Sequence, residues 1–293
     1  MNKANKINTD SKEYMELVEL AKSLKADIGL SNDAPIANDL ELLLDKKEIV
    51  LVSLPIDTTQ ARPFAALLIE INNKQRTDFY IGLNSNDYFD KQLFAIAHEL
   101  YHYSERTDHH ISRGDEESPI EETAELFAAE FLLPLQTLKK IIINEFGKLD
   151  ISNVSVGKLL RFIAKIHCYW WLPYKSIVRR LKEAGAISPV TFHDLYNIDE
   201  RNPQSEYYRI GLSTNEDIFS RLNKITRKTG TDLKNLETLA RNYEDGIIDE
   251  AEMIQNLTLF SKSPEDLGLE YGITDDDDEM GLLFSQLRET NED

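Results

Sequence analysis

Two histidines four residues apart constrain the fold of this chain more than any other feature. The segment from Phe94 to Glu105 reads FAIAHELYHYSE, in which His98 and His102 are one helical turn apart and Glu99 follows the first histidine directly. On an α-helix, residues four apart lie on one face, one turn above the other. If the segment is helical, both imidazoles can therefore point at one metal ion. We predict that the segment is a helix and that the rest of the chain supplies a further ligand.

This HExxH spacing is typical of zinc peptidases. A catalytic zinc site uses three protein ligands and keeps one position for water, and the metal lowers the pKa of that water to about 7. Glu99 lies beside the two histidines, so it is expected to act on the water as a general base without binding the metal. The same pattern also arises by chance in unrelated chains, so a third ligand in a suitable place is the first test of this interpretation.

The third ligand is expected from the acidic segment that follows, IEETAELFAAEF. Glu121 is the favoured ligand, and Glu125, four residues later on the same face, is predicted to support a ligating imidazole. Asp108 stays open as an alternative, because it stands where the longer HExxHxxGxxH pattern has its third histidine, although Glu105 replaces the glycine of that pattern. A solvated acidic helix start would also explain any one of these carboxylates. The remaining carboxylates of the segment are Glu122 and Glu130.

The charge balance limits the classes of partner. The 293 residues include 33 basic and 52 acidic side chains, which gives a formal net charge of −19. Such a surface repels other polyanions and argues against non-specific binding of nucleic acid or anionic membranes. The single cysteine, Cys168, excludes an internal disulfide. The start shows no signal-peptide pattern and no apolar run approaches the roughly 20 residues of a membrane span, so a cytoplasmic protein with no membrane partner is expected.

Hydrophobic periodicity predicts an α+β fold in which a small sheet precedes the helix with the two histidines. After that helix, a polar loop at 106–119 and a helix that ends at Pro134 are expected, and beyond Pro134 the chain is predicted to be mostly α-helical. The predicted elements before the loop are helices at 11–29 and 39–44, strands at 49–54, 64–72 and 78–84, and the histidine-bearing helix at 87–105.

Three segments, in this order, resemble the ImmA/IrrE family of zinc metallopeptidases: FYIGLN, QLFAIAHELYHY and EETAELFAAEFLLP. The resemblance covers about residues 12–190, since VSVGKLLRFIAKIHCYWWLPYKSIVRRLKEAGAIS is similar to the helical region that follows the peptidase core in that family. It implies a zincin-like core in which His98 and His102 bind zinc. It also implies that Glu121 is the acidic ligand and Glu99 the base.

Two positions depart from the family pattern. Tyr101 stands where glycine is usual, and it is expected either to narrow the cleft or to point into the core. Glu125 stands where asparagine is usual, which keeps a hydrogen-bond acceptor but adds negative charge near the metal. Tyr101, Tyr103, His109 and His110 are further candidates for oxyanion donors or cleft residues, although a histidine pair in a polar loop is more often simply exposed.

Residues 158–182 reverse the acidic trend, because they contain seven basic side chains and no Asp or Glu. Two basic helical faces on helices joined by a short turn resemble a helix-turn-helix. One interpretation is a docking site for nucleic acid or an acidic partner, and the other is a solvated cationic face that balances an acidic protein. The faces consist of Lys158, Arg161 and Lys165 on the first helix and Lys175, Arg179 and Lys182 on the second.

These features predict three parts: a zincin-like metallopeptidase core at 1–140, a helix-turn-helix-like segment at 141–200 and a helical extension with an acidic tail at 201–293. The expected activity is that of a zinc-dependent endopeptidase. The resemblance implies a narrow protein substrate, commonly a helix-turn-helix repressor, that is cleaved in a stress, mobile-element or phage-related switch. In the alternative, the metal site is structural or vestigial, and the protein binds a transcription regulator or nucleic acid through its basic helices.

Overall fold

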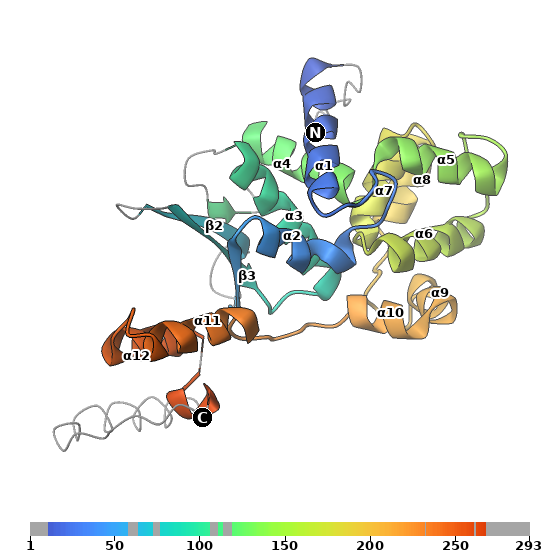
Figure 1. The fold of residues 1–293 in the computed structure, drawn as a ribbon. Coiled ribbons are helices and arrows are strands. Elements are labelled where there is room, and N and C mark those ends of the chain that lie inside the picture. Colours follow the sequence, from blue (N-terminus) through green and yellow to red (C-terminus); the bar gives the residue numbers. More distant parts are fainter. Residues whose placement is uncertain are drawn as a thin grey trace. The chain divides into compact units, whose positions relative to one another are not determined.

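The structure is a computed structural model of the chain, shown in Figure 1, and it describes residues 11–57, 64–72, 77–105, 111–113, 119–231, 233–260 and 262–267. The chain divides into two compact units, residues 1–229 and 230–293. The boundaries predicted near residues 140 and 200 fall inside the first unit. The division into a core at 1–140 and a helix-turn-helix-like segment at 141–200 stays a prediction.

The sheet of the first unit has four strands in the order β1-β3-β2-β4. β1 (Ile49–Leu54) runs parallel to β3 (Thr77–Asn84), whereas β2 (Phe64–Asn72) pairs antiparallel with β3 and with the short β4 (Ile111–Arg113). The first three strands agree with the predicted apolar runs. β4 lies where a loop was predicted, because three residues are too few to show a strand periodicity in the sequence.

The first helix of the chain begins at a side-chain cap. α1 (Lys12–Asp27) follows Ser11, whose hydroxyl oxygen accepts a hydrogen bond from the Tyr14 backbone N–H at 3.1 Å, as is usual for an N-cap serine. A 3₁₀ turn (Ala37–Asp39) leads into α2 (Leu40–Lys46), which packs against β1. Both helices agree with the stretches predicted from apolar spacing.

α3 (Phe89–Glu105) carries the HExxH segment and lies at the centre of the first unit. It packs against β2 and β3, and α4 (Pro119–Leu132) packs along it (Figure 1). The helical spacing predicts that Leu93, Phe94, Ala97 and Leu100 of α3 pack inward. Three of them are buried, and Phe94 is partly buried against the core. Two packed helices and a sheet therefore frame the segment that bears the histidines.

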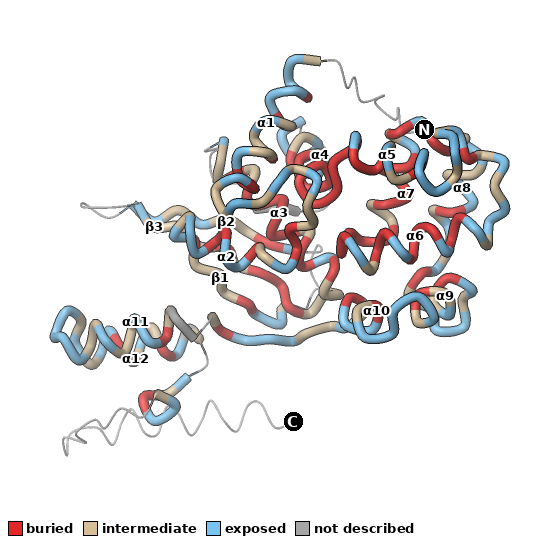
Figure 2. The backbone as a smooth tube through the Cα atoms, turned by 45° about the vertical axis from the view of Figure 1, so that its right-hand side comes forward, coloured by how far each residue is buried: buried red, intermediate tan, exposed pale blue. Residues whose placement is uncertain are grey.

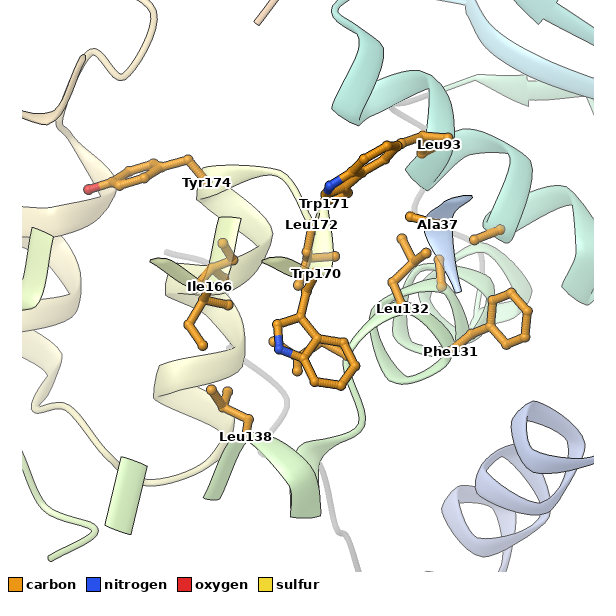
Figure 3. Packing of buried hydrophobic residues seen from close by; sticks show 14 of the residues in the cluster. Ala37, Leu93, Phe131, Leu132, Leu138, Ile166, Trp170, Trp171, Leu172 and Tyr174 are labelled. Carbon is orange, nitrogen blue, oxygen red and sulfur yellow. The ribbon is translucent and has the colours of Figure 1, made fainter. Parts of the chain in front are cut away.

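The remaining helices of the first unit extend the same core. Buried side chains from the sheet and from these helices form one continuous cluster, and Figure 2 shows long buried stretches in α3, α4 and α6. In Figure 3, Trp170 and Trp171 lie among side chains that come from α3, α4 and α5, such as Leu93, Leu132 and Leu138. The helices are α5 (Leu135–Phe146), α6 (Val156–Trp170), α7 (Tyr174–Glu183), α8 (Pro189–Tyr196), α9 (Glu206–Thr214) and α10 (Glu216–Leu222).

The second unit contains α11 (Leu233–Glu244), α12 (Glu250–Leu259) and a 3₁₀ turn (Pro264–Leu267). Gly246, between the two helices, has a φ of 68°, a left-handed conformation that glycine adopts without steric cost. Within the described residues, no helix of either unit is both long enough and apolar enough to span a lipid bilayer. Among the described residues of the second unit, Leu236, Met253 and Leu257 form a buried hydrophobic cluster.

Lys25 is a buried cation on α1. Its ammonium group donates hydrogen bonds to the carbonyls of Asn32 and Ala34 at 3.0 and 2.9 Å. Burial lowers the pKa of Lys25 to about 8, and the negative charge of Glu130 opposes this shift only in part. An unfolded lysine titrates near 10.4. Between about pH 8 and 10.4 the unfolded state therefore binds more protons than the folded state, and the free energy of unfolding must rise with pH in that window.

We expect Lys25→Met to remove this pH dependence. The Lys25 contribution to the free energy of unfolding should rise by about 1–2 kcal/mol between about pH 7.5 and 9.5, as measured by urea unfolding at the two pH values. Lys22→Met is the control, because the Lys22 side chain on the same helix is 42% exposed and should leave the rise unchanged. An equal rise in the Lys25→Met variant and the wild type would show that Lys25 stays protonated throughout.

Candidate metal centre

His98 and His102 lie on one face of α3, and both are almost completely buried. Their Nε2 atoms are 3.2 Å apart, and their ring centroids are 5.0 Å apart. The helix therefore brings one nitrogen of each imidazole to a common point, as i, i+4 side chains on an α-helix can.

Glu121 reaches the same point from the first turn of α4. Its Oε2 atom is 3.0 Å from Nε2 of His98, and its Oε1 atom is 3.3 Å from Nε2 of His102. The three residues each offer a ligand atom within 4.8 Å of the others. The structure thus assembles two imidazoles from α3 and one carboxylate from α4, which is the ligand set of many catalytic zinc sites.

The distances among these atoms fit a metal ion better than a hydrogen-bonded cluster. A tetrahedral zinc ion with ligand bonds of about 2.0–2.1 Å separates its ligand atoms by about 3.3 Å, and the three contacts here are 3.0, 3.2 and 3.3 Å. A neutral imidazole Nε2 carries at most one hydrogen, so it cannot donate to the other imidazole and to the carboxylate at once. A cation at the centre satisfies all three side chains, so the residues present fit zinc.

Glu99 is fully buried beside this cluster. Its Oε2 atom accepts a hydrogen bond from the Leu68 backbone N–H at 2.9 Å, and Leu68 lies on β2, which packs against α3. A strand of the sheet therefore holds the carboxylate in one orientation. No sequence signal marks Leu68, because the contact uses its backbone and not its side chain.

The comparison with known families agrees with this geometry. Residues 59–182 match the family model of peptidase M78, which is described as the IrrE N-terminal-like domain. This segment matches the ImmA/IrrE family. The match confirms the resemblance and the α+β, zincin-like fold predicted from the sequence, and it indicates a metallopeptidase. It begins later in the chain than residue 12, where the predicted resemblance starts. No curated protein and no solved structure matches the chain.

Glu125, which was predicted to support a histidine ligand, has a different partner in the IrrE N-terminal-like domain. Its side chain is 57% exposed and pairs with Arg179 of α7 at 3.3 Å. Four residues advance a helix by about 6 Å, so Glu125 lies one turn beyond Glu121 and extends past the histidines to the neighbouring helix. An exposed pair of this kind contributes little to stability.

Of the other candidate ligands, Glu130 has a structural role, and Glu122 and Asp108 stay predictions. Glu130 is buried and accepts hydrogen bonds from the Tyr14 hydroxyl at 2.7 Å and from the Arg180 guanidinium, so it ties α4 to α1 and α7. Glu122 is exposed on α4. Asp108 lies outside the described residues.

Tyr101 of the IrrE N-terminal-like domain contacts both the core and a metal-ligand candidate. Its ring centroid is 5.6 Å from that of the buried Phe127 and 5.9 Å from that of His102. Burial raises the pKa of Tyr101 above its ordinary value, with a smaller contribution from the charge of Glu105. The phenol therefore stays protonated at neutral pH, and its ring fixes α3 against α4 where the family usually has glycine.

Of the other predicted cleft residues, Tyr103 gives no support to an oxyanion role. Tyr103 points away from the histidine cluster, because its hydroxyl donates to the Lys47 carbonyl at 3.4 Å and its ring packs edge-on against Phe79 at 4.9 Å. His109 and His110 lie outside the described residues, so their roles stay predictions.

The basic side chains of α7 are engaged within the fold. The Lys175 ammonium donates to the Tyr196 carbonyl, and the Arg179 guanidinium donates to the Tyr196 hydroxyl at 2.9 Å. The Lys182 ammonium lies 4.3 Å from the centroid of the Phe192 ring. All three therefore contact α8.

The basic side chains of α6 are exposed. Lys158 and Arg161 lie on the outer face of the helix, and Lys165 pairs with Glu145 at 2.9 Å with both side chains largely in solvent. Docking of nucleic acid or an acidic partner stays a prediction, and in this structure it rests mainly on Lys158 and Arg161.

Proposed function

We propose that this protein is a zinc-dependent endopeptidase of narrow specificity. The observation that carries the proposal is the convergence of ligand atoms from His98, His102 and Glu121 next to the buried Glu99. When zinc is bound, it lowers the pKa of water to about 7 and polarises the peptide carbonyl as a Lewis acid.

The side chains of the cluster divide the remaining work. His98, His102 and Glu121 hold the metal. Glu99 takes the proton of the attacking water on its carboxylate and passes it to the leaving amine. The Leu68 N–H holds Glu99 in place, so the base needs little reorientation when a peptide binds.

A basic, DNA-binding repressor is the substrate class that we propose. The ImmA/IrrE resemblance implies a helix-turn-helix repressor, and nucleic-acid-binding proteins are typically basic. The net charge of −19 favours encounter with such a partner. Cleavage of the repressor would then operate a stress, mobile-element or phage-related switch.

A purely binding role through the basic helices has weaker support. Three of the six basic residues proposed for docking already contact α8, and a fourth is paired with Glu145. If the protein nevertheless worked by binding, charge reversal of Lys158 and Arg161 would abolish the biological response, and Glu99→Gln would leave that response intact.

The proposal is tested by metal analysis together with a cleavage assay. We expect about one zinc per purified chain, as for other catalytic zinc sites. When the product of the adjacent gene is tested as the repressor substrate, we expect its conversion into two fragments on the intact-mass spectrum. Chelation should stop the cleavage, and added zinc should restore it. A chain that binds no divalent metal contradicts the zinc assignment, whereas a zinc-loaded chain that leaves the repressor intact contradicts the substrate.

A further inference from the structure

The first turn of α3 is held by residues that follow the family-matched segment in the chain. The Phe89 backbone N–H donates to the Lys224 carbonyl at 3.0 Å, and the Gln92 amide donates to the Thr226 hydroxyl at 3.0 Å. The Arg221 guanidinium lies 5.0 Å from the centroid of the Phe89 ring. The helix with the histidines is therefore fixed at its start by the last segment of the first unit.

A buried ionic network joins the same turn. Asp90 is fully buried, and its carboxylate accepts hydrogen bonds from Arg201 at 2.8 and 2.7 Å and contacts Nε2 of His167 at 3.0 Å. The other ring nitrogen of His167 lies 2.9 Å from the Tyr207 hydroxyl. Burial alone would raise the pKa of Asp90, but the His167 hydrogen bond and the Arg201 charge outweigh it and lower the pKa below the ordinary value. The carboxylate is thus ionised at neutral pH.

This network is better suited to fixing a position than to adding stability. Burying charges costs solvation that mutual attraction often fails to recover, and apolar residues of similar volume commonly serve stability as well. The Asp90 carboxylate, by contrast, is contacted at once by Nη2 of Arg201 and by Nε2 of His167, and charge-assisted hydrogen bonds of this kind are short and directional. The Asp90 carboxylate meets both Arg201 and His167 only when α3 has one axial position and one rotation.

The position of α3 matters because the candidate ligands come from two helices. At 1.5 Å per residue, His98 and His102 lie about 12 and 18 Å along α3 from Asp90, whereas Glu121 belongs to α4. A slide or rotation of α3 would move both imidazoles together against that carboxylate. Ligand distances in metal sites hold within about 0.2 Å, so even a small displacement would weaken the site.

We propose that Asp90 and Arg201 are positioning residues that fix the register of α3, so that His98 and His102 meet Glu121 around the metal. The inference rests on the proposed function only in one respect, which is that the site binds a metal. It requires no assumption about the substrate. It places part of the machinery that shapes the metal centre beyond residue 182, outside the segment that matches the family.

The experiment compares metal binding by three full-length variants. Arg201→Gln removes the charge and the hydrogen bonds that Nη2 donates to both Asp90 oxygens, so we expect zinc affinity, measured by chelator competition, to fall about fivefold. The visible absorption of the Co²⁺-loaded protein, which reports the ligand geometry, should change as well. Arg201→Lys keeps the charge and should restore part of both properties. Leu138→Ala is the control, because it truncates a fully buried side chain of α5 and lowers stability while Asp90 and Arg201 stay in place.

Altered metal binding in Arg201→Gln, but not in Leu138→Ala, supports the positioning role. Wild-type zinc affinity and an unchanged Co²⁺ spectrum in Arg201→Gln overturn it, and so does the same change in both variants, since that would reflect lost stability alone. If the wild type and the variants show the expected metal behaviour while the wild type cleaves no protein, the proposed peptidase function fails and the positioning role stands.

Discussion

Glu99→Gln is expected to reduce cleavage by about 10²–10⁴-fold, the usual contribution of a general base, without loss of zinc. Glutamine has nearly the same shape as glutamate but cannot take up a proton at neutral pH. Its amide oxygen can still accept the Leu68 N–H that holds Glu99 at 2.9 Å, so the local structure should survive. Cleavage of the repressor at equal zinc content is the measurement.

The matched control for this variant is Glu122→Gln. It makes the same chemical change on an exposed residue next to Glu121, so it should leave both zinc content and cleavage close to those of the wild type. A zinc-loaded Glu99→Gln protein that cleaves at the wild-type rate would exclude Glu99 as the base. Equal losses in both variants would point to the negative charge around the site instead of proton transfer.

Local spacing along the chain is what made the candidate centre predictable. His98 and His102 share a face because they are four residues apart on one helix, and no other part of the fold is needed for that. The three main strands are continuous apolar runs, and the helix with Glu121 starts at a Ser-Pro step that is typical of a helix N-terminus. Each of these features is encoded within about twenty residues of sequence.

Contacts between distant segments account for what the sequence did not reveal. In the sequence, Asp90 resembles an acid that stabilises a helix N-terminus through the helix dipole. In the structure it is buried against Arg201, which lies 111 residues later in the chain. Arg179 has the pattern of a solvated cation, yet it pairs with Glu125 and contacts Tyr196. In such cases the partner is chosen by the packing of helices, and no periodicity within either segment specifies it.

Glu121→Ala is expected to have the largest effect on metal binding. It removes one of three protein ligands, and since loss of a residue that merely supports a ligand costs about 10–100-fold in affinity, we expect a loss above about 100-fold and no detectable cleavage. Glu121 is partly exposed, with 14% of its side chain accessible, so truncation should leave the fold intact. Zinc affinity by chelator competition and the melting temperature of the metal-free protein measure the two properties separately.

Glu125→Ala and Asp108→Ala decide between the carboxylates that the sequence left open. Glu125 pairs with Arg179 at the surface, so its removal should change zinc affinity little. If Asp108 were the third ligand, Asp108→Ala would abolish zinc binding and Glu121→Ala would retain it, which is the reverse of the result expected here. Because His98 and His102 contribute equally under both assignments, this pair of variants isolates the third ligand, on which the tetrahedral site depends.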